Sequence, residues 1–176
     1  SSKRYEIWTM QSAYHNLPTI NGVPQKDGRQ YQAQNVAYSA SDAAVTFSLD
    51  IAKAYPEEAR VDSWRRTLTL VRGRRVQLAE SYNLKDFVQP FSLSLMTPLL
   101  VDTSTPGKVL LVDSQAKPGL SVIITYDSGQ LRASAEPIEV TDGRLRSAWG
   151  QRLTRLLLVS SSKSLHGEYQ IEIEQK

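Results

Sequence analysis

The stretch Ala44-Val45-Thr46-Phe47-Ser48-Leu49-Asp50-Ile51 decides the fold class. Its apolar side chains stand at every second position: Val45, Phe47, Leu49 and Ile51. Successive side chains of a β-strand point to opposite faces of the sheet, so this alternation predicts a half-buried strand whose four apolar residues share one face.

Similar alternation, or a short apolar run, recurs along the chain. We expect further strands at residues 64–71, 76–80, 91–95, 109–112, 120–126, 131–134, 138–140, 153–159 and 168–174. Gly73 should supply the positive φ of a tight hairpin turn, with Leu68 and Leu70 facing the core opposite Val76 and Leu78. Closely spaced strands without a helix-length periodic segment predict an all-β fold, an antiparallel β-sandwich.

The length of 176 residues fits one domain, residues 1–176, or one sandwich with a smaller final sheet appended over about residues 105–176. Cysteine is absent, which excludes disulfides and thiol chemistry. Lys and Arg number 21 against 18 Asp and Glu, and the excess is dispersed, so we expect no nucleic-acid partner. This balance permits an anionic polysaccharide as ligand. No apolar run reaches the ~20 residues of a membrane helix, so we expect no membrane insertion.

Four motifs carry a family resemblance. The first surrounds one of the two histidines, in Trp8-Thr9-Met10-Gln11-Ser12-Ala13-Tyr14-His15-Asn16-Leu17-Pro18, and the turn Asn21-Gly22-Val23-Pro24-Gln25 follows it. Asp50-Ile51-Ala52-Lys53-Ala54-Tyr55-Pro56 and Trp64-Arg65-Arg66-Thr67 complete the set. Together they resemble the C-terminal β-sandwich of the heparinase II/III-like polysaccharide lyases, over nearly the whole chain.

The resemblance implies a parent enzyme that eliminates across a glycosidic bond beside a uronic acid. In that family a multi-helix toroid precedes the sandwich and carries much of the catalytic apparatus. No such helical region is present in this sequence, so we expect no catalytic residue here and a structural, interfacial role that closes the substrate cleft. The implied partners are the helical toroid and, through the full-length protein, an anionic polysaccharide, either a glycosaminoglycan or alginate. A periplasmic or secreted bacterial location is implied in the same way.

The resemblance also implies a zinc ion, which the family's sandwich binds through two histidines and an aspartate. His15 stands at the position of one of these histidines. The family's other ligand segments have no counterpart here, so we expect zinc in the full-length parent and none in the fragment. The alternative is that His15 is a surface or half-buried histidine with a satisfied hydrogen bond.

Three neighbours of His15 are candidate substrate-binding residues: Asn16, Trp8 and Tyr14. Asn16 could instead brace the turn, since asparagine readily bonds nearby backbone. Trp64 and Trp149 could stack on sugar rings, but a strand tryptophan more often lies in a core or interface. The arginines around Gly73 more often form a solvated hairpin tip than a sugar site. The alternative function is a non-catalytic carbohydrate-binding or structural β-sandwich module.

Overall fold

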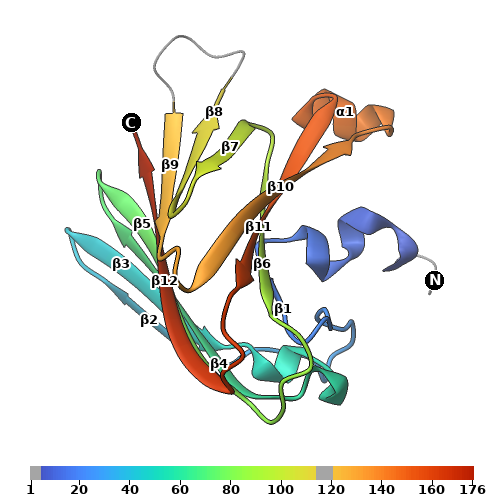
Figure 1. Ribbon diagram of the computed structural model, residues 1–176, viewed down its shortest axis with the longest axis vertical. Coiled ribbons are helices and arrows are strands. Elements are labelled where there is room, and N and C mark those ends of the chain that lie inside the picture. Colours follow the sequence, from blue (N-terminus) through green and yellow to red (C-terminus); the bar gives the residue numbers. More distant parts are fainter. Residues whose placement is uncertain (1–4, 114–120) are drawn as a thin grey trace.

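The computed structural model describes residues 5–113 and 121–176, which form two β-sheets (Figure 1). The smaller sheet has the strand order β1-β6-β11-β10 and the larger has the order β2-β3-β4-β5-β12-β9-β8-β7. All paired strands in the described residues run antiparallel. The predicted all-β antiparallel sandwich is therefore confirmed.

The strand bounds extend most of the predicted segments. The strands are β1 (Pro18–Thr19), β2 (Gln34–Ala40), β3 (Ala44–Asp50), β4 (Val61–Val71), β5 (Arg75–Leu84), β6 (Ser92–Thr97), β7 (Leu100–Thr105), β8 (Lys108–Val112), β9 (Ser121–Tyr126), β10 (Leu131–Glu139), β11 (Arg152–Ser160) and β12 (His166–Gln175). Residue 120, the first of one predicted strand, lies outside the described residues. Strands β8, β9 and β12 join the larger sheet while β10 and β11 join the smaller. The strands beyond residue 105 are thus shared between both sheets.

Helical structure in the described residues is short. The α-helix is α1 (Gly143–Trp149), and the 3-10 turns are η2 (Trp8–Met10), η3 (Ser12–Tyr14), η4 (Ala52–Ala54) and η5 (Glu57–Ala59). Helix α1 was not predicted, because seven residues are too few to show a helical period. Its start is fixed locally, since the Asp142 carboxylate accepts hydrogen bonds from the backbone N–H groups of Arg144 and Leu145.

An aromatic group joins the two sheets in the core. The Trp64 ring stacks on Tyr82 with 5.1 Å between ring centroids, and it meets the edge of Phe91 at 5.1 Å. Phe91 immediately precedes β6 of the smaller sheet and stacks on Tyr169 of β12 at 5.2 Å. Trp64 is fully buried, which confirms its interpretation as a core residue.

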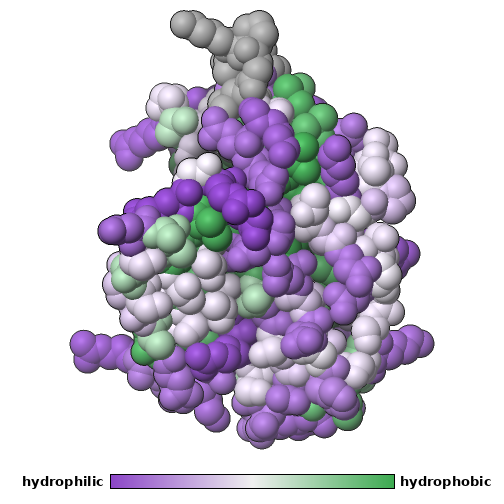
Figure 2. Space-filling model, turned by 90° about the vertical axis from the view of Figure 1, so that its left-hand side faces the viewer, coloured by the Kyte–Doolittle hydropathy of each residue, from purple (hydrophilic) through white to green (hydrophobic). Residues whose placement is uncertain are grey.

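Leu68 and Leu70 do not lie in the core, and this part of the prediction was wrong. Leu68 pairs across the larger sheet with Phe47 on one side and Leu78 on the other, so the three share a face as expected. Along that row, exposure falls from 68% at Tyr38 to 36% at Leu68 and 5% at Leu78. Four strands cannot cover eight, so the apolar residues near the β2 edge remain open to solvent. Figure 2, seen from the side of the larger sheet, shows mostly hydrophilic residues with hydrophobic ones in separate spots.

The Asn21-Gly22 turn has a structural role. Asn21 lies in the left-handed region at φ 51°, and its buried amide donates to the carbonyls of Ala59 (2.9 Å) and Asp86 (3.0 Å). Its Oδ1 accepts from the N–H groups of Val88 (2.9 Å) and Gln89 (3.3 Å). One side chain therefore fixes the loop after β1 to two other loops. This explains why asparagine suits that position of the motif.

Candidate functional site

The chain before β1 folds over the smaller sheet and lines a cavity of about 360 Å³ that is open to solvent. This segment contains the turns η2 and η3, and it lies on the same side of the molecule as α1 (Figure 1). We call this space the N-terminal cavity; it is lined by Trp8, Thr9, Tyr14, His15, Asn16, Met96, Thr97, Pro98, Trp149 and Leu153. The structure thus brings together all four candidate site residues predicted from the sequence.

His15 is exposed, and one of its ring nitrogens is engaged. Its Nε2 lies 3.2 Å from the carbonyl oxygen of Thr9. A carbonyl can only accept, so Nε2 carries the hydrogen in this contact, and in the neutral imidazole Nδ1 then presents its lone pair. A backbone carbonyl that holds the second nitrogen is the usual support for a metal-binding or proton-accepting histidine.

A metal site would need more ligands than His15. Within residues 5–113 and 121–176, no three His, Cys, Asp or Glu side chains come close enough together to hold a metal ion. Zinc sites use three or four protein ligands. The described residues therefore do not fit a zinc ion by themselves, and His15 could supply one ligand only.

Asn16 anchors the segment to the smaller sheet. Its Oδ1 accepts a hydrogen bond from the N–H of Met96 in β6 at 2.9 Å, and its backbone carbonyl accepts from Arg66 Nη1 at 2.7 Å. It does brace the chain, but against a strand 80 residues away rather than against its own turn. With Oδ1 occupied, Nδ2 is the group of this amide that can donate a further hydrogen bond.

Arg155 of β11 clamps the aromatic side of the cavity. The guanidinium carbon lies 4.6 Å from the Tyr14 ring centroid, and Nη1 donates to the carbonyl of Ala13 at 3.4 Å. Glu136 of β10 holds the same guanidinium through Nη2 at 2.5 Å. Tyr14 in turn meets Trp8 edge-on, with 5.3 Å between ring centroids. Contacts among β10, β11, η2 and η3 thus fix the rings beside His15.

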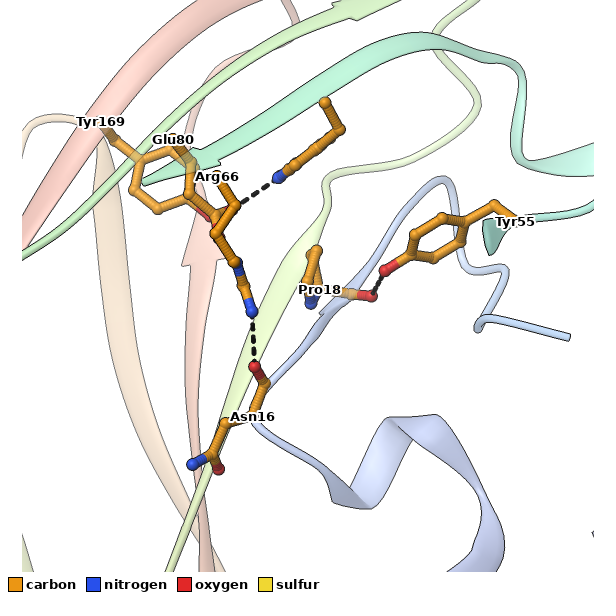
Figure 3. A network of polar contacts seen from close by, with 7 residues as sticks. Asn16, Pro18, Tyr55, Arg66, Glu80 and Tyr169 are labelled. Atoms are coloured by element: carbon orange, nitrogen blue, oxygen red, sulfur yellow. Dashed lines mark hydrogen bonds and ion pairs between the residues drawn. The ribbon is translucent and has the colours of Figure 1, made fainter. Parts of the chain in front are cut away.

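A buried ion pair lies behind Asn16 (Figure 3). The Glu80 carboxylate accepts hydrogen bonds from Arg66 Nε, from Trp64 Nε1 at 2.6 Å, and from the Tyr169 hydroxyl. Because Arg66 also donates to Asn16, the pair links the core to the cavity wall. Burial raises the pKa of Tyr169 well above its usual value, and the negative charge of Glu80 raises it further.

The sequence interpretation missed Arg155 and favoured a core or interface position for Trp149 over contact with a sugar. Trp149, at the end of α1, is 43% exposed and lines the cavity. Arg155 carries no recognisable motif, because its role depends on strand pairing with β10. Of the hairpin arginines, Arg72 and Arg74 are exposed at the turn, as expected for a solvated tip.

None of the described helices is long and apolar enough to cross a lipid bilayer.

No protein-family model matches the sequence, and no curated protein does. Solved structures do match the fold. Heparan sulfate lyase HepC from Pedobacter heparinus superposes with a TM-score of 0.71 at 9% identity, over 98% of this chain and 25% of that one. The heparinase III BT4657 gene product gives 0.69 at 12% identity, over 100% of this chain and 26% of that one.

Another heparinase III structure gives a TM-score of 0.68 at 12% identity, over 99% of this chain and 25% of that one. The chain therefore spans about a quarter of the length of the lyases that it matches. The match covers the whole sandwich, so it does not depend on one sheet or one motif. The resemblance seen in the sequence motifs thus extends to the fold, which is that of the β-sandwich part of heparinase III-like lyases.

Proposed function

We propose that this chain is the C-terminal β-sandwich domain of a polysaccharide lyase that cleaves uronate-containing glycans by β-elimination. The observation that carries the proposal is the coverage of the structural match. Nearly all of this chain superposes on heparan sulfate lyase HepC, yet it accounts for only 25% of that enzyme. A domain of this kind acts together with the remaining three quarters of such an enzyme.

In this proposal the sandwich closes one side of the substrate cleft, and a helical toroid supplies the catalytic groups. Elimination needs a base for the C5 proton, a group that neutralises the uronate carboxylate, and an acid for the leaving oxygen. The N-terminal cavity is the part of the sandwich that would face the cleft. There, Trp8 and Tyr14 offer ring surfaces and Asn16 offers an amide N–H to the glycan.

His15 is the proposed metal ligand of the longer protein, where zinc would stiffen the interface between the domains. Its support is the contact from Nε2 to the Thr9 carbonyl, which leaves Nδ1 available to bind. The other ligands would come from outside the described residues. We also propose a periplasmic or secreted location, on the family resemblance alone.

The test is an absorbance assay for unsaturated uronate products on heparin, heparan sulfate, chondroitin and alginate. The 176-residue chain is compared with a version extended upstream from the native gene. Product from the extended protein only is the expected result, and the best substrate identifies the glycan. Product from the 176-residue chain would contradict the assignment of the catalytic groups to the toroid. No product from either protein would favour a binding or structural module.

Zinc content of the extended protein tests the role of His15. His15→Ala should reduce the bound zinc. The matched control is His166→Ala, which removes the other histidine, an exposed residue of β12. Equal zinc in both variants would remove His15 from the ligand set.

A further inference from the structure

The N-terminal cavity has an aromatic wall that the motifs do not account for. Trp149 is the last residue of α1, and it lines the cavity together with Trp8 and Tyr14, which come from the other end of the chain. Single exposed apolar residues are common, but an exposed indole in the wall of a formed cavity offers a flat binding surface.

The backbone at Trp149 is fixed by contacts at both ends of its helix. Asp142 caps the start of this helix, and Arg146 donates from Nε to the carbonyl of Val140, the residue that follows β10. Gly150 follows at φ +80° and turns the chain into β11. A side chain other than glycine would be strained there. The helix, its cap and this turn therefore fix the backbone that carries Trp149 before any ligand arrives, which reduces the entropy lost on binding.

The chemistry of the lining selects the kind of ligand. Among the described residues that line the cavity there is no Lys, Arg, Asp or Glu, and His15 is the single titratable base. Moving a carboxylate or sulfate into a partly apolar space without a cationic partner is unfavourable. Hydroxyl and amide groups of an uncharged sugar ring can instead bond to Asn16 Nδ2, Thr97 and His15, while the apolar ring face lies on an indole.

We propose that the N-terminal cavity is a subsite for an uncharged pyranose ring, with Trp149 as its stacking platform. The volume of about 360 Å³ lies at the lower end of the range for small-ligand sites, as suits one or two sugar rings. The assignment of a glycan ligand rests on the proposed function. The preference for the uncharged ring rests on the lining residues alone. In a chain of alternating uronate and hexosamine, the hexosamine occupies this subsite and the uronate lies outside it.

The test uses the 176-residue chain and two oligosaccharides of equal length. One is unsulfated, with alternating uronate and N-acetylhexosamine, and the other is an alginate fragment composed of uronate only. Binding is followed by the change in tryptophan fluorescence, to which Trp64 contributes a constant background because it is fully buried and out of reach of the ligand. Amide chemical shifts give a second readout. We expect the alternating oligosaccharide to bind at least tenfold more tightly, with little change between 50 and 500 mM salt, since no Lys, Arg, Asp or Glu side chain among the described residues lines the subsite and the guanidinium of Arg155 beside it is paired with Glu136.

Trp149→Ala should weaken this binding about tenfold, which corresponds to about 1.4 kcal/mol. Trp149→Phe keeps a ring and should have an intermediate affinity. The control is Tyr38→Ala, which removes an aromatic residue that is 68% exposed on β2 and does not line the cavity. Far-UV circular dichroism verifies that each variant is folded.

The subsite is refuted by any of three results: equal affinity of Trp149→Ala and the unmodified chain, tighter binding of alginate, or no binding of the alternating oligosaccharide. The result of the lyase assay is independent of this binding test. Sugar binding that depends on Trp149 without product from the extended protein would retain the subsite and reject the lyase. Product from the extended protein, together with sugar binding that Trp149→Ala leaves unchanged, would retain the lyase and reject the subsite.

Discussion

Replacing Arg66 with Met should destabilise the chain far more than the same change at the adjacent Arg65. Arg66 is 6% exposed and Glu80 is 2% exposed, so the ion pair between them is shielded from water. Without Arg66, the Glu80 carboxylate keeps only the donors Trp64 Nε1 and the Tyr169 hydroxyl. Removing one partner of a buried pair costs about 3–5 kcal/mol, because the other charge is left uncompensated.

The expected fall in unfolding free energy for Arg66→Met is thus about 3–5 kcal/mol. It corresponds to a Tm lower by roughly 6–20 °C at this chain length. Urea unfolding followed by far-UV circular dichroism measures it. Arg65→Met is the matched control, since Arg65 is exposed on the opposite face of β4 and donates to Ser48 Oγ of β3 at 3.1 Å. Its change should stay within about 0.5 kcal/mol.

A second variant separates the ion pair from loss of packing. Glu80→Gln combined with Arg66→Met removes both charges while an amide oxygen still accepts from Trp64 and Tyr169. The double variant should recover a large part of the lost stability, which a double-mutant cycle measures as coupling. The reasoning is refuted if Arg66→Met costs no more than Arg65→Met, or if the double variant is as unstable as the sum of its single changes.

Three further predictions follow from the same contacts. Asn21→Ala should lower the unfolding free energy by more than about 2 kcal/mol, because it leaves buried backbone groups of two loops without partners. Urea unfolding measures this loss, and a value below about 0.5 kcal/mol would contradict the prediction. Burial raises the pKa values of Tyr55 and Tyr169 above 10.0, so the unfolded chain loses these protons first. Stability should therefore be constant with respect to these groups below about pH 10 and fall by about 1.4 kcal/mol per pH unit for each tyrosine above it. Tyr55→Phe should remove its share of that slope in alkaline unfolding curves, and an unchanged slope would contradict the assignment. Arg155→Met should raise the rate of amide hydrogen exchange in residues 8–15 about tenfold, because the Tyr14 contact and the Ala13 hydrogen bond are lost. The control is Arg152→Met, at the exposed start of β11, which should leave this rate unchanged. Equal exchange rates in both variants would contradict the role of Arg155.

Local sequence was sufficient for the fold class and for most of the strands, but β1, β2 and β7 were not predicted. The alternation in residues 44–51 depends only on the two-residue period of a strand, so it could be read without knowing the partner strands. The same holds for the hairpin turn at Gly73, whose φ of 68° follows from the local demand for a left-handed residue. The grouping of His15 with Trp8, Tyr14 and Asn16 was also accessible, because the four residues lie within nine positions of one another.

Tertiary structure decided which alternating face is covered and which distant residues complete the cavity. Leu68 has the pattern of a core residue, yet it is exposed because the smaller sheet ends before reaching it. Arg65 and Arg66 are identical in type and adjacent, and only the pairing of β4 with β5 places Arg66 against Glu80. Trp149 and Arg155 reach the N-terminal segment from more than 130 residues away in sequence. Such contacts leave no local pattern, since they arise from the packing of one sheet against a segment that is remote along the chain.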